Sequence, residues 1–296
     1  MTVLRVGDPG PLTLVQDLGR PHRAADGVAA SGAADREAHR LAQRLVGNLD
    51  GAAGLEVLLG GLRLVATGPA VVAVTGARCT VLLDGVPQGQ DRALAVPAGG
   101  TLALRSVTGG VRTYLAVRGG LGVTPVLGSR SRDTLGGVGP PPVAAGDDLP
   151  VLRPARPSRA AWFEAVPVRP VGDRVGVLRG PHADALDAAT WRAVQAAVLR
   201  VGQAVDRVGV RLDPPERLRE RLAGAAGDLP SFPVLPGCIQ LTPDGALVVL
   251  GPDAGVTGGY PVVAVAEPAG RDVLAQVRPG DALRLRPVYP TLPRTR

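Results

Sequence analysis

The sequence predicts a mainly β protein made of two related domains with a few helices. Its 296 residues include 41 Gly and 29 Pro, which suit short strands joined by many turns better than long helices. Short apolar runs recur about every 8–12 residues, a spacing typical of a β-barrel or sandwich. Only 2% of the residues are aromatic, so the core must be built from Val, Leu and Ala.

The first half is predicted to open with two short strands followed by a helix. Apolar residues at 3–6 and 12–15 flank a turn rich in Gly and Pro, and a loop that begins at Asp17 leads to the helix. The helix is predicted over 33–46, where apolar residues recur at i, i+3, i+4 and i+7. His39 lies within it, and we expect this side chain on the solvent-exposed face.

Strands are predicted to follow from residue 55 onward. The short apolar runs span 55–59, 62–66, 70–75, 79–83, 93–96, 101–105 and 113–117. Asp84-Gly85 directly follows one of these runs. It is a strong signal for a tight hairpin, because both residues tolerate a positive φ.

A proline-rich stretch predicts a domain junction near residues 150–170. We therefore assign residues 1–155 to an N-terminal domain and residues 165–296 to a C-terminal one. The second domain is predicted to repeat the order of a strand, a helix and then further strands. These elements are a strand at 174–178, a helix over 184–201, and strands at 208–212, 237–241, 247–250, 262–265 and 282–286.

The charge of the chain is positive, but its pattern does not favour nucleic acid. The formal net charge is +7, and all 33 basic residues are arginines spread along the chain. Few aromatic rings are available to stack on bases, so we expect no nucleic-acid partner. The absence of lysine excludes a phosphate-binding P-loop, a Schiff base with pyridoxal phosphate, and biotin attached to this chain.

Residues that commonly bind metals or act as nucleophiles are few and scattered. They are Cys79, Cys238, His22, His39 and His182. None of them forms a zinc-binding spacing, so we predict no metal site. Isolated cysteines suit a reducing cytoplasm, and neither a secretory leader nor a long apolar run is visible. We therefore expect a cytoplasmic protein with no membrane partner.

Polar side chains next to glycines are the best candidates for function, because a backbone without Cβ atoms can approach a ligand closely. Five segments have this character: VQDLGRP (15–21), SGAADR (31–36), DRVGVRL (206–212), PGCIQ (236–240) and TGGYP (257–261). Each of them can equally be a tight turn, a helix cap or a surface ion pair.

Taken together and in order, these segments resemble one protein family. VQDLGRP, SGAADREAHRLAQRLVGN and GLEVLLGG are similar to motifs of the family that includes allophanate hydrolase subunit 2, KipA and the C subunit of 5-oxoprolinase. That family is homologous to the carboxyltransferase domain of urea carboxylase. The later stretches YLAVRGG, VLGSRS, PGCIQLTPDG, TGGYPVVA and LAQVRPGD also fit, so the resemblance covers residues 3–288.

The resemblance implies two cyclophilin-like β-barrel domains in a chain that is one subunit of an enzyme. In the 5-oxoprolinase system, a KipI-like B subunit and an A subunit take part, and the complex uses ATP to open the lactam of 5-oxoproline to glutamate. ATP is then a cofactor shared with partner subunits. This agrees with the absence of lysine, since another chain can supply it.

The implied reaction guides the choice of site residues. Phosphorylation of the lactam oxygen by ATP would activate the carbonyl, and guanidinium groups would neutralise the transferring phosphoryl group. We predict Arg20, Arg207 and Arg211 for this role, and Tyr260 as a further catalytic residue. The predicted substrate- or nucleotide-binding residues are Gln16, Asp17, Gly19, Ser31, Gly32, Asp35, His182, Gln240, Thr257, Gly258 and Gly259.

Three functions are compatible with the resemblance. The first is the C subunit of a 5-oxoprolinase, and the second is the carboxyltransferase subunit of a urea-carboxylase-like enzyme whose biotin is carried by a partner. The third is a non-catalytic, KipA-like partner of a kinase inhibitor. The chain has His182, Gly255 and Val262 where the family usually has two glutamines and a lysine, which favours a changed substrate or the third function.

Overall fold

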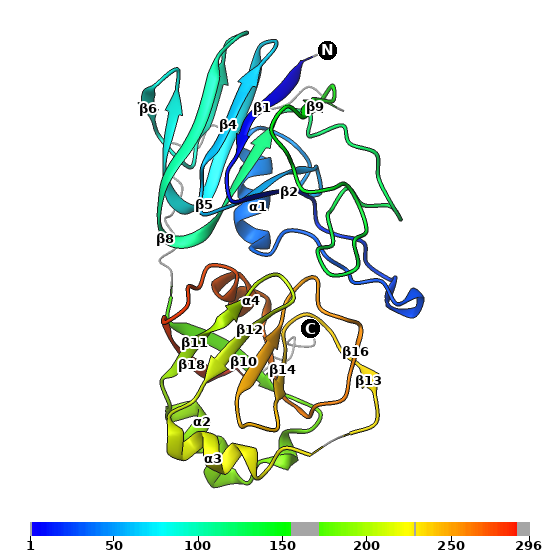
Figure 1. Cartoon of the computed structure of the whole chain (residues 1–296), viewed down its shortest axis with the longest axis vertical. Coiled ribbons are helices and arrows are strands. Elements are labelled where there is room, and N and C mark those ends of the chain that lie inside the picture. Colours follow the sequence, from blue (N-terminus) through cyan, green and yellow to red (C-terminus); the bar gives the residue numbers. More distant parts are fainter. Residues whose placement is uncertain (1, 155–171, 228, 289–296) are drawn as a thin grey trace, which may run out of the picture. The chain divides into compact units, whose positions relative to one another are not determined.

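The computed structural model describes residues 2–154, 172–227 and 229–288. The chain divides into two compact units, residues 1–171 and 172–296 (Figure 1). The second unit is a closed barrel and the first a half-barrel sheet, which confirms the predicted mainly β, two-domain fold class. The predicted junction at 150–170 lies mostly outside the described residues, so its position stays a prediction.

In the first unit, the described residues form a nine-stranded sheet. Its strands are β1 (Val3–Pro9), β2 (Leu12–Gln16), β3 (Gly54–Leu58), β4 (Leu62–Ala66), β5 (Ala70–Leu83), β6 (Val86–Gln88), β7 (Ala93–Val96), β8 (Thr101–Val117) and β9 (Asp148–Pro150). Six of them follow the order β2-β3-β8-β4-β1-β9, and β5 pairs with β6, β7 and β8. Because β8 pairs with β3, β4 and β5, it is the central strand of the unit.

Two long strands replace four predicted short ones. The runs at 70–75 and 79–83 are one strand, β5, and those at 101–105 and 113–117 are one strand, β8. The pairing of β5 with β8 shifts register between Gly76 and Arg78, and again before Thr80. These β-bulges bend the strands without ending them, so turn-like residues inside the run were misleading. The Asp84-Gly85 hairpin is confirmed, with φ of 50° and 81°.

Helix α1 (Arg36–Leu45) packs against β5 and β8, and a short 3-10 turn, η1 (Ala24–Asp26), lies in the loop before it. The helix begins at Asp35, whose carboxylate accepts a hydrogen bond from the Ala38 backbone N–H at 3.0 Å. The predicted exposure of His39 is wrong, because this side chain is only 1% exposed. Its ring packs edge-on against Tyr114 of β8, so the buried face of the helix is wider than its apolar stripe.

The second unit is a closed barrel in the order β10-β17-β14-β15-β12-β11-β18, with a separate two-stranded sheet β13-β16. The strands are β10 (Arg174–Arg179), β11 (Leu199–Val205), β12 (Gly209–Asp213), β13 (Phe232–Pro233), β14 (Cys238–Leu241), β15 (Leu247–Leu250), β16 (Thr257–Gly258), β17 (Val262–Ala266) and β18 (Ala282–Pro287). The parallel pair of β10 with β18 closes the barrel.

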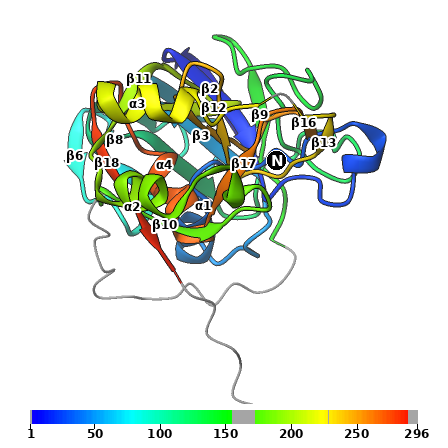
Figure 2. The same cartoon turned by 90° about the horizontal axis from the view of Figure 1, so that it is seen from below.

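Helices cover both ends of this barrel. They are η2 (Ala183–Ala185), α2 (Ala188–Ala196), α3 (Glu216–Ala223) and α4 (Pro268–Leu274). Figures 1 and 2 show α2 and α3 side by side at one end and α4 at the other. No helix of the described residues is long and apolar enough to cross a bilayer.

The helix predicted over 184–201 is partly wrong. The helix α2 starts only after Asp187, which caps it by accepting a hydrogen bond from the Thr190 N–H at 2.6 Å. It ends at Ala196, and strand β11 follows from Leu199. Buried and exposed side chains alternate at 199–201, which is the two-residue period of a strand. The apolar spacing of these residues had been interpreted as helical.

Candidate functional site

In the first unit, the VQDLGR and SGAAD segments cross each other at two glycines. Gly19 and Gly32 have φ of +87° and +90°. A Cβ on Gly19 would lie 2.4 Å from the Ala30 oxygen, and a Cβ on Gly32 would lie 2.7 Å from the Leu18 carbonyl carbon. These glycines therefore allow two loops of this chain to approach each other closely, whereas the sequence had suggested the close approach of a ligand.

Asp17 anchors a third segment to this crossing. Its carboxylate accepts hydrogen bonds from the hydroxyls of Ser129 and Ser131, and from the backbone N–H of Gly19 and Arg130. The Ser129 bond is 2.7 Å long and the Arg130 bond is also 2.7 Å. Oδ1 accepts three of these bonds and Oδ2 accepts the one from Arg130, so Asp17 positions the loop around residue 130.

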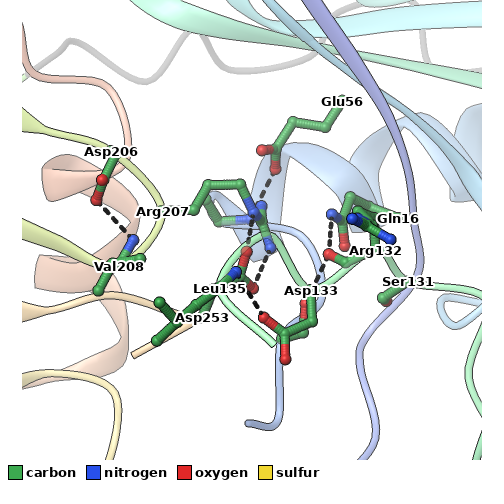
Figure 3. Close-up of polar contacts among 12 residues, drawn as sticks. Gln16, Glu56, Ser131, Arg132, Asp133, Leu135, Asp206, Arg207, Val208 and Asp253 are labelled. Carbon is green, nitrogen blue, oxygen red and sulfur yellow. Dashed lines mark hydrogen bonds and ion pairs between the residues drawn. The ribbon is translucent and has the colours of Figure 1, made fainter. Parts of the chain in front are cut away.

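Three further predicted residues converge on the same segment. Gln16 Nε2 donates to the Arg132 carbonyl at 2.8 Å (Figure 3). Ser31 Oγ donates to the same carbonyl at 2.9 Å, and Arg20 donates to the Ser131 carbonyl. Gln16 Oε1 is buried and has no hydrogen-bond partner among the described residues. We call this set, Gln16, Asp17, Gly19, Arg20, Ser31 and Gly32, the N-terminal polar cluster.

A second buried network adjoins α1, and sequence reasoning missed most of it. Glu56 accepts hydrogen bonds from the Tyr114 hydroxyl at 2.8 Å and from the Ala34 N–H at 2.9 Å, and it faces Arg112 Nε at 3.4 Å. The Tyr114 oxygen in turn accepts from the Asp35 N–H at 2.8 Å. Burial raises the pKa of Tyr114 well above its ordinary value, so the hydroxyl stays a donor. The sequence signal for this network was Glu56, a single acidic residue inside the apolar run GLEVL.

In the second unit, Arg207 is held by Asp253. Arg207 Nε and Nη2 lie 2.8 and 2.9 Å from the two carboxylate oxygens, and the side chains are 3% and 0% exposed (Figure 3). Asp206 accepts from the N–H groups of Val208 and Gly209, which fixes the turn between β11 and β12. This bidentate pair occupies the fork of the guanidinium, and the catalytic role of Arg207 stays a prediction.

Arg211 takes part in a partly exposed ion-pair network. Its Nε lies 3.0 Å from Asp213, and its Nη2 lies 2.5 Å from Asp244, which Arg219 also contacts. The hydrogen bond to Asp244 raises the pKa of Arg211. Arg211 pairs with Val248 across the sheet, and Val248 pairs with Gln240, so Arg211 and Gln240 share the outer face of the barrel.

The TGGYP segment lies over Gln240. Gln240 is only 7% exposed, and a Cβ on Gly258 would lie 2.5 Å from its Nε2. Gly258 pairs with Phe232, whose ring lies 4.7 Å from the His182 imidazole. Tyr260, two residues further on, is 40% exposed. The structure thus brings His182, Gln240 and the segment 257–260 together.

A pocket of about 360 Å³ opens beside His182. Its walls are Pro181, His182, Asp184, Ala185, Ala225, Gly227, Leu229 and Pro261. These come from the segment around η2, the segment after α3 and the end of TGGYP. The described residues contain no group of three or more His, Cys, Asp or Glu placed to hold a metal ion.

Comparison with known proteins identifies the family. Residues 26–287 match the family described as the carboxyltransferase domain, subdomains A and B. The chain belongs to this carboxyltransferase family. The family match extends over both units and includes the His182 pocket, and of the N-terminal polar cluster it includes Ser31 and Gly32.

This chain resembles relatives of two kinds. It is 34% identical over 288 residues to the C subunit of the 5-oxoprolinase of Escherichia coli K12, covering 95% of this chain and 90% of that protein. It is 31% identical over 306 residues to the urea amidolyase of Lachancea kluyveri, covering 96% of this chain but 17% of that protein.

Solved structures show the same fold. The crystal structure of TTHA0988 superposes with a TM-score of 0.85 at 38% identity, over 97% of this chain and 56% of that one. The urea amidolyase of K. lactis superposes with a TM-score of 0.86 at 29% identity, over 97% of this chain and 19% of that one. The chain therefore spans about half of the first protein and a fifth of the second.

Proposed function

We propose that this chain is the C subunit of an ATP-dependent 5-oxoprolinase. A KipI-like B subunit and an A subunit complete the enzyme, which hydrolyses 5-oxoproline to glutamate in the cytoplasm. The observation that carries the proposal is the similarity to the C subunit of the E. coli 5-oxoprolinase along 90% of that protein. Similarity to a urea amidolyase extends over only 17% of that larger protein.

The arginines of this chain favour a site in which partners bind the nucleotide. Arg207 is 3% exposed, and its guanidinium donates two hydrogen bonds to the carboxylate of Asp253 in the same unit. A buried guanidinium that already donates these hydrogen bonds cannot bind a triphosphate without losing them. We therefore assign the phosphates of ATP mainly to the partner subunits, and substrate binding to this chain.

The exposed groups of the second unit are consistent with a chain that binds the substrate while its partners bind the phosphates of ATP. Thr257 and Tyr260 are exposed residues with hydroxyl groups. Tyr260 directly precedes Pro261 of the pocket lining, and Thr257 directly precedes Gly258, which lies against the amide of Gln240. Hydroxyls and neutral N–H groups orient a lactam through hydrogen bonds, without the charge that a phosphoryl group requires.

Reconstitution tests this function. The chain is purified with its KipI-like B subunit and its A subunit, and ATP hydrolysis and glutamate formation are measured with and without 5-oxoproline. We expect both activities to require 5-oxoproline and all three proteins. A complex of all three proteins that hydrolyses no ATP in response to 5-oxoproline would contradict the proposal.

A carboxyltransferase function is the second candidate, and the family match together with the urea amidolyase fold favours it. The chain contains no lysine, so biotin would be carried by a partner. Copurification of a partner that avidin detects, with biotin-dependent carboxyl transfer, would replace the first proposal by this one. A kinase inhibitor as the copurifying partner, without turnover, would indicate the regulatory, KipA-like function.

A further inference from the structure

The hydrogen bonds of His182 fix which of its ring nitrogens carries the proton. Its Nδ1 accepts a hydrogen bond from the Val262 backbone N–H at 3.2 Å. An accepting nitrogen has no proton, so the neutral imidazole carries its proton on Nε2. The His182 backbone N–H donates in turn to the Val262 oxygen at 3.0 Å, so residue 182 is held by both polar groups of Val262.

Packing fixes the direction of the ring as well. A Cβ on Gly180 would lie 2.3 Å from the Val262 oxygen, so the segment before His182 lies directly on β17. Phe232 packs on the imidazole at a centroid distance of 4.7 Å and a tilt of 51°. The Nε2–H group is thus a donor with a fixed position, the kind of group that orients a ligand at low entropic cost.

The pocket that His182 helps to line is small and mostly apolar. Its volume of about 360 Å³ is at the lower end of the range for ligand pockets, which suits a single small ring. Pro181, Pro261 and Leu229 supply apolar walls. Asp184 is the acidic residue of the lining, and Arg179 lies 3.1 Å from it.

These features select a neutral ring with a carbonyl oxygen. No arginine is among the described residues that line the pocket, and the exposed carboxylate of Asp184 is already paired with Arg179, so the lining offers a carboxylate no guanidinium partner. A carbonyl oxygen satisfies Nε2–H, while methylene groups of the ring replace water against the prolines. A five-membered lactam has both properties on one flat ring.

We propose that the His182 pocket binds the lactam ring of the substrate, with His182 Nε2–H donating to the lactam carbonyl oxygen. The choice of 5-oxoproline as the natural ligand rests on the proposed function, whereas the preference for a neutral cyclic amide rests on the pocket itself. The carboxylate of 5-oxoproline then points out of the pocket. His182 acts as a substrate-binding residue that selects and orients the carbonyl.

NMR of the intact chain tests binding directly. The chain has only three histidines, so the Cε1–H signal of His182 can be assigned by comparing the wild type with His182→Gln. The probes are 2-pyrrolidinone, 5-oxoproline and proline, which lacks the ring carbonyl. We expect saturable shifts of the His182 signal and of the Leu229 methyl signals with the first two probes and none with proline. No saturable shift with 2-pyrrolidinone would overturn the proposal.

Two variants separate the donor from the shape of the pocket. His182→Gln keeps a neutral N–H donor of similar reach, whereas His182→Leu removes the donor. We expect the Kd for 2-pyrrolidinone, followed on the Leu229 methyls, to rise about tenfold in His182→Leu and to stay within about threefold of the wild type in His182→Gln. His22→Gln, in a loop of the first unit, is the control. Equal affinity in His182→Leu and the wild type would refute the role of His182.

Turnover by the reconstituted complex separates this proposal from the proposed function. If both hold, His182→Leu raises the KM for 5-oxoproline about tenfold and His182→Gln restores it. If the complex hydrolyses 5-oxoproline with an unchanged KM in His182→Leu, the function stands and the pocket assignment fails. If 2-pyrrolidinone binding depends on His182 but 5-oxoproline is not hydrolysed, the pocket stands and the proposed function fails.

Discussion

At the scale of single residues, the N-terminal polar cluster depends on one carboxylate that accepts four hydrogen bonds. Asp17 accepts hydrogen bonds from two hydroxyls and two backbone N–H groups. The side chain is 7% exposed, so water cannot readily replace a lost acceptor. The VQDLGR motif therefore has a structural meaning, holding three loops together, whether or not it also touches a ligand.

Replacing Asp17 by Asn is expected to destabilise the first unit by about 2–3 kcal/mol, because one carboxylate oxygen becomes an NH₂ group that faces donors. Urea unfolding at pH 7 measures the loss. Asp26→Asn is the matched control, since Asp26 forms an exposed ion pair with Arg23. We expect less than about 0.5 kcal/mol for the control. Equal losses in the two variants would show that Asp17 is not an anchor.

His39 is expected to make the protein sensitive to mild acid. Burial lowers the pKa of His39 to about 4, although the carboxylates of Asp17 and Glu56 raise it. In the unfolded state the pKa of His39 is about 6.5, so below this pH the unfolded state binds a proton that the folded state does not bind. The free energy of unfolding therefore falls as the pH drops from about 6.5 to 4. The loss attributable to His39 is up to about 3 kcal/mol.

The free energy of unfolding at pH 7 and at pH 4.5 checks this, measured by urea in wild type and in His39→Gln. The variant should lose less stability between the two pH values than the wild type does. His22→Gln keeps the buried imidazole and should retain the full pH dependence. An identical pH dependence in all three proteins would refute the role of His39.

At the scale of elements, strands with a regular apolar period could be predicted from the sequence, whereas bulges that interrupt this period could not. Strands such as β4 and β7 were predicted within a residue, because each is a short alternating run between turns. β5 was divided at Gly76, where a bulge keeps the ladder continuous. Helix α3 was missed because arginines and glutamates hide its two buried leucines, Leu218 and Leu222. Local sequence reports propensity, whereas bulges and burial are decided by the neighbouring strand.

The turn between β11 and β12 depends on an ion pair between elements. Arg207 precedes β12, and Asp253 follows β15, so their buried pair links two loops of the barrel. Asp253→Asn should cost about 3 kcal/mol, because it removes the carboxylate charge that pairs with a buried guanidinium. Asp213→Asn, in a partly exposed pair with Arg211, should cost less than about 1 kcal/mol.

The same variants decide what Arg207 contributes to function. Urea unfolding gives the stability of each variant, and turnover of the reconstituted complex gives its activity at a temperature where both variants stay folded. A purely structural pair predicts that folded Asp253→Asn keeps its KM and kcat. A loss of kcat in fully folded protein would restore Arg207 to the catalytic set.

At the scale of the whole molecule, the resemblance to a family predicted more than the patterns did. Ordered motifs along the chain gave the two-barrel fold, which composition and spacing alone left as barrel or sandwich. The His182 pocket could not be predicted, because its walls come from segments near residues 183, 227 and 261. Only the closure of the barrel brings such distant segments together, and no local period encodes it.

Each unit has its own apolar core, which predicts separable responses to the variants above. One core is formed by residues such as Leu55, Leu104 and Leu115, and the other by residues such as Leu212 and Ile239. A domain with its own core is expected to unfold as a cooperative unit. Asp17→Asn should therefore destabilise the first unit, and Asp253→Asn the second.

Tryptophan fluorescence can follow one unit at a time. The chain has two tryptophans, and Trp162→Phe leaves Trp191, which packs in the core of the second unit. In this background, the urea midpoint reported by Trp191 should fall with Asp253→Asn and stay within error with Asp17→Asn. Hydrogen exchange of amides in β3 and β8 should show the reverse order. If both variants shifted both probes equally, the two units would unfold as one cooperative unit. The prediction that Asp17 stabilises only the first unit and Asp253 only the second would then be wrong.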